Sequence, residues 1–182
     1  MRKDFEAVAA TAPDFYHRYL AMVPEGDLLN LLREQLNKLQ AYFKALPEAK
    51  HGYAYAPGKW TPRDILGHIT DAERIFQYRI LRFARADETP LPGFNEDDYV
   101  PHGDFNGRGM DLLVYEFGMA RLSSIALVQS LDAAAWERSG IANGNRISVR
   151  ALVWILIGHP LHHLHVIQER YLPDVWVQEG TH

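Results

Sequence analysis

Apolar residues recur every three or four positions along four stretches of the chain, the spacing that places them on one face of an α-helix. Asp27, Thr61 and Ser148 stand just before three of these stretches, and each is a residue type that caps helix N-termini. Pro62 follows Thr61 at the first helical position, where proline is favoured. The pattern predicts helices over residues 27–46, 62–84, 113–131 and 149–172.

The segments outside these helices carry weaker signals. Residues 1–26 show only a faint helical pattern, and we expect them to pack over the other helices. Asn143-Gly144 predicts a tight turn in a small hairpin. Apart from this hairpin, no long stretch of the chain shows the alternating pattern of a strand. We therefore predict an all-α protein in which residues 1–182 form a single domain with the architecture of a four-helix bundle.

Residues 85–109 form a long irregular stretch between the second and third predicted helices. Connections of this length in a compact domain are commonly functional lids or disordered segments. Because the stretch contains Phe94, Tyr99 and Phe105, we expect it to form an ordered cover.

Four histidines lie within seven positions of the last predicted helix. His159 and His163 are one turn apart and share its apolar face, whereas His162 falls on the polar side together with Gly158. Two imidazoles directed into an apolar interior need polar partners there. A metal ion could serve both, or each could bond separately to a carbonyl or carboxylate.

The second predicted helix carries two polar residues, His68 and Arg79, on its inward stripe. In a bundle, His68 could meet His159 and His163, and three imidazoles would leave a coordination position open for water or substrate. Nitrogen ligands suit a divalent metal such as zinc, nickel or iron and do not choose between them.

Two further residues are candidates for catalysis. Asp71 lies one turn from His68 and could orient it or relay protons, although the commoner case is that Asp71 and Glu73 both sit on a solvated helix face. Arg79 needs an anionic partner on its buried stripe, either a structural carboxylate such as Glu116, the commoner case, or an anionic substrate.

Pro160 follows His159 inside the last predicted helix. A proline there removes a backbone donor and should kink or widen the helix. It could re-aim His159, or it could be a neutral irregularity.

The composition excludes several classes of protein. A net charge of -4 with no dense run of Lys or Arg argues against nucleic-acid binding. The apolar runs are too short for a membrane span, and the first 15 residues lack the hydrophobic region of a signal peptide, so we expect a cytoplasmic protein. The chain has no cysteine, so any thiol in its chemistry would arrive as a cosubstrate.

Three stretches of the chain form recognisable motifs: YAPGKWTPRDILGHITDAERIFQYRILRFARAD, the following TPLPGFNEDDYV, and GHPLHHLHVIQERYL. In these stretches the sequence resembles the DinB-like (DinB/YfiT-like) superfamily of four-helix-bundle metalloproteins. It implies a bundle of DinB/YfiT type and a divalent metal held by three histidines, which here correspond to His68, His159 and His163. Pro160 departs from the commoner family pattern, in which a polar helix former is usual at that position.

The resemblance also bears on function. Family members with an assigned activity look like transferases and isomerases that use low-molecular-weight thiols, and many others are described only as metal-dependent hydrolases. Our leading hypothesis is a thiol-dependent S-transferase that acts on a small-molecule electrophile, with a low-molecular-weight thiol as partner and a homodimer as the assembly. A hydrolase is the alternative.

A non-catalytic stress-response protein that binds metal is a further alternative, as is a metal-free structural bundle. The non-catalytic metal protein predicts a filled site, with His162 or a loop carboxylate as fourth ligand. In any metal site of this kind we expect the affinity to weaken as the pH falls through about 6.5, because a protonated imidazole cannot ligate.

Overall fold

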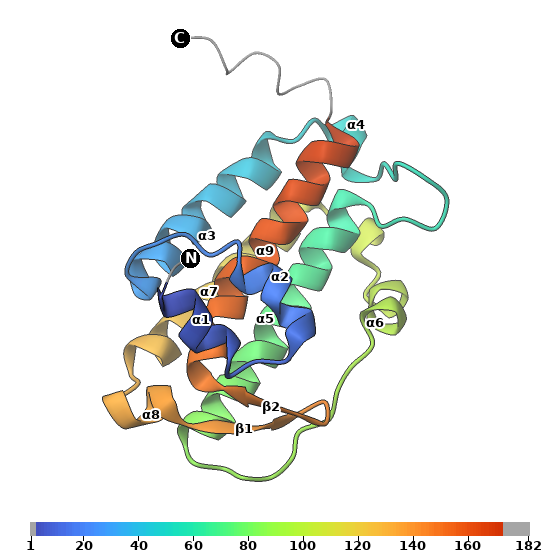
Figure 1. The fold of residues 1–182 in the computed structure, drawn as a ribbon. Helices are drawn as coiled ribbons and strands as arrows, with labels where there is room; N and C mark the ends of the chain where they lie inside the picture. Colours follow the sequence, from blue (N-terminus) through green and yellow to red (C-terminus); the bar gives the residue numbers. More distant parts are fainter. Residues whose placement is uncertain (1–2, 173–182) are drawn as a thin grey trace.

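Four long helices dominate the computed structural model, which describes residues 3–172 (Figure 1). They are α3 (Leu28–Ala45), α5 (Pro62–Ala84), α7 (Met110–Gln129) and α9 (Val149–Tyr171). The side chains of Asp27, Thr61 and Ser148 each accept a hydrogen bond from the backbone N–H three residues on, at 2.9, 3.2 and 3.0 Å. The predicted N-caps and the four-helix architecture are confirmed.

The helices do not follow one another around the bundle. Helix α5 packs against α7 and α9, and α3 packs against the same two helices. The consecutive helices α3 and α5 therefore lie on one diagonal of the bundle, and α7 and α9 lie on the other. This order differs from a simple up-and-down bundle, in which consecutive helices are neighbours.

Short elements connect and cover the long helices. At the N-terminal end, α1 (Lys3–Ala9), the 3-10 turn η1 (Asp14–Tyr16) and α2 (His17–Leu20) pack over the bundle, with α2 against α9 (Figure 1). The remaining short helices are α4 (Glu48–His51), α6 (Glu96–His102), the 3-10 turn η2 (Phe105–Gly107) and α8 (Ala133–Glu137).

The predicted hairpin is present. Strands β1 (Ser139–Ala142) and β2 (Asn145–Ser148) pair antiparallel, with Ala142 opposite Asn145. The two turn residues have positive φ, 50° at Asn143 and 73° at Gly144, as a type I′ turn requires.

Residues 85–109 form an ordered cover that includes α6 and η2. Phe105 is buried against α5, and a Cβ added to Gly67 would lie 2.3 Å from its ring. Glycine at position 67 thus allows the covering segment to approach the helix closely. The rings of Tyr99 and Phe94 lie tilted against each other with centroids 5.3 Å apart, and Tyr99 is itself 47% exposed.

Helix α9 runs through the centre of the buried core. Residues 151–160 are all buried, since α2 covers the side of the helix on which we had placed polar residues. Gly158 is the clearest case, because a Cβ there would lie 2.0 Å from the carbonyl oxygen of Tyr19. Assigning Gly158 to the polar side of the helix was therefore wrong. Within residues 3–172, no helix has the length and apolarity needed to cross a bilayer.

Candidate metal centre

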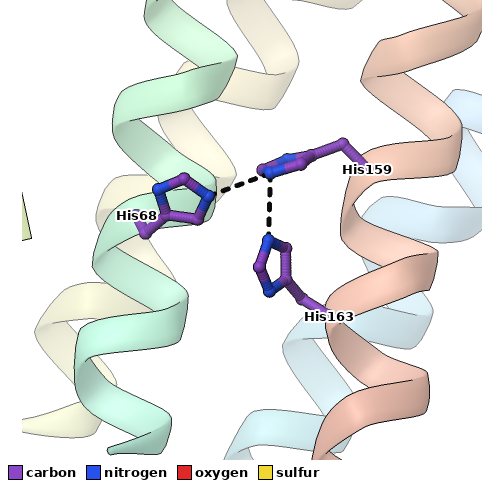
Figure 2. Close-up of side chains that lie close together, drawn as sticks. All are labelled: His68, His159 and His163. Atoms are coloured by element: carbon purple, nitrogen blue, oxygen red, sulfur yellow. Dashed lines mark hydrogen bonds between the residues drawn. The ribbon is translucent and has the colours of Figure 1, made fainter. Parts of the chain in front are cut away.

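His68, His159 and His163 converge between α5 and α9 (Figure 2). The Nε2 atom of His159 lies 2.9 Å from Nε2 of His68 and 3.0 Å from Nε2 of His163. The three candidate ligand nitrogens all lie within 4.8 Å of one another. The structure therefore brings together the three side chains that helical periodicity had turned inward.

Hydrogen bonding between the imidazoles cannot satisfy all three nitrogens at once. A neutral imidazole nitrogen carries either one proton or one lone pair. The Nε2 atom of His159 faces two neighbours, so it can bond well to only one of them.

A cation shared by the three lone pairs would resolve this conflict. Three nitrogens at 2.0–2.1 Å from a tetrahedral zinc ion lie roughly 3.3 Å apart. The two distances from Nε2 of His159 are a few tenths of an ångström shorter than this. Small side-chain movements would therefore fit the donor set to a metal ion. Within residues 3–172 the cluster has no fourth ligand, and His162 is not a member of it.

Burial keeps the three histidines in the neutral form that ligates metals. It lowers the pKa of His68 to about 4. It also holds the pKa values of His159 and His163 well below the usual value, and for both residues the neighbouring histidines add to the effect. The imidazoles are therefore deprotonated at neutral pH.

Aromatic rings enclose the histidine cluster. Trp60, just before α5, lies with its ring centroid 4.8 Å from that of His68 and stacks on His163 at 6.4 Å. Tyr19 meets His159 edge to face at 5.3 Å. Sequence reasoning did not single out these two residues, since they come from segments that only the tertiary fold brings to the site.

Pro160 is accommodated inside α9 by a buried polar network. Proline has no N–H, so the carbonyl of Leu156, four residues earlier, loses its helical donor. Arg121 on α7 donates to that carbonyl at 2.8 Å, and Gln35 on α3 donates to the next carbonyl, that of Ile157, at 2.8 Å. Arg121 thus replaces the donor that Pro160 lacks, and Gln35 adds a second bond at the turn that precedes His159.

The same network corrects the placement of Glu73. We had considered a solvated helix face for Glu73, but it is 2% exposed and accepts two hydrogen bonds of 2.8 Å from Arg121. Arg121 also donates to the amide oxygen of Gln35 at 2.6 Å. Glu73 is therefore a structural residue that balances the buried charge of Arg121. The spacing of residues within α5 could not reveal this partner, because it lies on α7.

Asp71 is consistent with the solvated helix face considered for it, whereas Arg79 lacks the partner expected for it. The carboxylate of Asp71 is partly exposed and accepts a hydrogen bond from Arg74 at 3.1 Å. The proposed pairing of Arg79 with Glu116 was wrong, because Glu116 pairs with Arg74 at 2.6 Å and with Arg108.

Next to the histidines is a cavity of about 280 Å³. Four buried residues are among those that line it: His68, His159, Arg79 and Phe76. The cavity lies beside Phe94 rather than beneath Tyr99 and Phe105. Its rim includes the exposed residues Arg18 and Glu96, so a small molecule could reach two of the three histidines from solvent.

The fold is similar to those of two solved structures. One is YfiT from Bacillus subtilis, described as a probable metal-dependent hydrolase with an unusual four-helix bundle topology; the TM-score is 0.70 at 18% identity, over 81% of this chain and 90% of that one. The other is a mycothiol-dependent maleylpyruvate isomerase, with a TM-score of 0.61 at 16% identity, over 80% of this chain and 61% of that one.

A curated relative and a family model extend this likeness to the sequence. A protein of Oceanobacillus iheyensis, provisionally named a metal-dependent hydrolase, is 27% identical over 156 residues, which are 78% of this chain and 86% of the relative. The model of the DinB superfamily matches residues 31–167, a range that includes all three histidines. The chain therefore belongs to the DinB superfamily.

Proposed function

We propose that this protein is a metal-dependent hydrolase in which His68, His159 and His163 hold a divalent ion. The observation that carries the proposal is the convergence of three imidazole nitrogens, two of them from the buried residues His68 and His159, which also line a cavity with exposed residues at its rim. Such a site combines a metal with access for a small molecule.

The ligand count favours a reactive site over a structural one. Structural zinc sites are commonly closed by four protein ligands, whereas catalytic sites keep a position for water or substrate. Across the part of the chain that the structure describes, only three residues contribute to the cluster. The filled site expected for a non-catalytic protein, with His162 or a loop carboxylate as fourth ligand, receives no support from this arrangement.

The ion would act as a Lewis acid, lowering the pKa of a water molecule or thiol so that a nucleophile exists near neutral pH. The chain's own residues prepare the site for it. Burial keeps the three imidazoles neutral, and the rings of Trp60 and Tyr19 limit the access of water to them. We assign Asp71 no step, because the contacts of its carboxylate are with Arg74.

The named relatives support hydrolysis more directly than thiol transfer. The descriptions of the Oceanobacillus protein and of YfiT both name a metal-dependent hydrolase. The sequence match to the Oceanobacillus protein covers most of both chains. We therefore place hydrolysis ahead of the S-transferase favoured from sequence. The choice of zinc, nickel or iron and the homodimer stay predictions.

Thiol-dependent transfer is the second candidate. The fold likeness to the mycothiol-dependent isomerase favours it, and the absence of cysteine from the sequence means that the thiol would be a cosubstrate. The two candidates share the same metal site and differ in the nucleophile.

One assay separates these functions. The metal-loaded protein is incubated with model esters, amides and alkyl halides, with and without glutathione, bacillithiol or mycothiol. We expect cleavage without any thiol, lost in His163→Ala and kept in His165→Ala, a change to an exposed histidine of the same helix. Turnover only with a thiol would establish the transferase, and no turnover by metal-loaded protein would favour the non-catalytic interpretation.

A further inference from the structure

Arg79 is a buried cation at the wall of the cavity. It is 3% exposed and lies on α5, three turns after His68. One of its terminal nitrogens donates to the hydroxyl of Tyr16 at 3.5 Å, and the other donates to the carbonyl of Pro92 at 3.1 Å. Its guanidinium carbon also lies 5.9 Å from the ring centroid of Phe76.

These contacts leave the charge of Arg79 without an anion. A guanidinium has five N–H donors, and the two hydrogen bonds of Arg79 both go to neutral oxygens. Within residues 3–172, no carboxylate lies within ion-pairing distance of it. Arg121, the other deeply buried arginine, by contrast forms a two-bond ion pair with Glu73 through its Nε and Nη2 atoms. A buried charge without a counter-ion is costly, which points to an anion that comes from outside the described part of the chain.

The position of Arg79 shows where that anion would bind. The same cavity touches the Arg79 side chain and the rings of His68 and His159. Phe76 lies between the two groups, 6.0 Å from the ring centroid of His159 and 5.9 Å from the guanidinium carbon. A single small molecule in this cavity could therefore place one end at Arg79 and the other beside the histidines.

We propose that Arg79 binds a carboxylate on the compound that reacts at the three histidines, so that the substrate or cosubstrate is a small organic acid. The planar fork of arginine matches a carboxylate. The cavity is lined by several aromatic side chains, and its three charged residues, Arg79, Arg18 and Glu96, sum to a single positive charge, which one carboxylate balances. This inference rests on the proposed function only in taking the cavity as the place where the reacting compound binds.

Binding can be tested without any turnover. Calorimetry compares benzoate, a monocarboxylate, with benzamide, its neutral analogue of similar shape, on metal-loaded and chelator-treated wild-type protein near neutral pH. We expect benzoate to bind at least tenfold more tightly than benzamide in both forms, since hydrogen bonds to a charged group are among the strong ones. Equal binding of the two compounds would overturn the proposal without recourse to any variant.

Variants then locate the effect. Arg79→Gln is expected to weaken benzoate binding about tenfold or more, and Arg79→Lys to weaken it less. Arg85→Gln makes the same change in charge at an exposed arginine just after α5 and is expected to leave binding unchanged. Two results would overturn the assignment: benzoate binding that is unchanged in Arg79→Gln, or benzoate binding that is lost when the metal is removed from the wild type. Glu96→Gln should tighten binding, and circular dichroism checks that each variant is folded.

Two further measurements show which compound carries the carboxylate, and whether this inference holds independently of the metal site. S-methylglutathione tests a thiol cosubstrate, because it carries the carboxylates of glutathione without the free thiol. Binding of this compound that depends on Arg79 would assign the carboxylate to the cosubstrate, whereas binding of benzoate alone would assign it to the hydrolysed compound. Metal content is measured separately, so a protein that binds benzoate through Arg79 but no metal would retain this inference and lose the proposed function.

Discussion

Arg121 donates a hydrogen bond of 2.8 Å to the carbonyl of Leu156, the acceptor that Pro160 leaves without a helical partner. The arginine side chain is fully buried, and its charge is balanced by Glu73. The network thus joins α5, α7 and α9 one turn before the first histidine of the last helix. Helix α9 continues as one element from Val149 to Tyr171 through this proline.

Removing this arginine should destabilise the fold strongly. Arg121→Met leaves Glu73 as an unpaired buried charge and the Leu156 carbonyl without a donor, so we expect a loss of about 3–5 kcal/mol in the free energy of unfolding. Urea denaturation measures it. Arg150→Gln, which breaks a solvent-exposed pair with Glu137, should cost less than about 1 kcal/mol. Similar losses in the two variants would contradict the role of the network.

The proline and the arginine should also be energetically coupled. Pro160→Ala restores an N–H that can donate to the Leu156 carbonyl, so removing Arg121 should cost less in that background. A double-mutant cycle of Pro160→Ala and Arg121→Met is expected to give a coupling energy of about 0.5–3 kcal/mol. Additivity would mean that the two residues act independently.

The close approach of α2 to α9 gives a third prediction. Gly158→Ala would place a Cβ 2.0 Å from the carbonyl oxygen of Tyr19, so α2 must move away from α9. We expect a destabilisation of about 1–3 kcal/mol, measured by urea denaturation. Gly52→Ala is the control, because the nearest atoms to its new Cβ are 4.0 Å away and the backbone φ there is -104°. The account fails here if the two substitutions have the same effect.

The stability of the metal-free protein should depend on pH. The unfolded chain protonates its histidines near 6.5, whereas in the folded protein burial lowers the pKa of His68 to about 4. Between these values the unfolded state binds more protons, so the free energy of unfolding is highest above pH 6.5 and falls as the pH drops toward 4. His68 is expected to account for about 3 kcal/mol of this change in the free energy of unfolding.

Urea denaturation of metal-free wild-type protein and of His68→Gln over this pH range measures that share. We expect a flatter pH dependence in the variant, and identical slopes would contradict the burial argument. An ordinary histidine would lose its affinity for metal near pH 6.5. Because burial lowers the pKa of these histidines, we expect the loss of metal affinity at a lower pH.

Much of the fold and the metal cluster follows from local pattern. The N-caps at Asp27, Thr61 and Ser148 and the inward positions of the three histidines depend on helical periodicity and capping chemistry, which act within a few residues. The diagonal placement of α3 and α5, by contrast, depends on how whole helices pack.

The partners of buried charges were not predictable in the same way. Glu73 and Arg121 are 48 residues apart, and each looks like an ordinary helix-surface residue until the two helices are placed side by side. Arg79 was correctly placed on a buried stripe, but its assumed partner Glu116 binds two other arginines. Periodicity shows that a charge is buried, whereas the identity of its partner depends on tertiary structure.

The central claim is that His68, His159 and His163 hold one divalent ion. Elemental analysis of wild-type protein, His163→Ala and His165→Ala, each purified in the same way and dialysed against the same buffer, tests it most directly. We predict about one metal ion per chain in the wild type and in His165→Ala, and a loss of most of it in His163→Ala. Equal metal content in all three proteins, or none in the wild type after exposure to zinc, nickel and iron, would contradict the account.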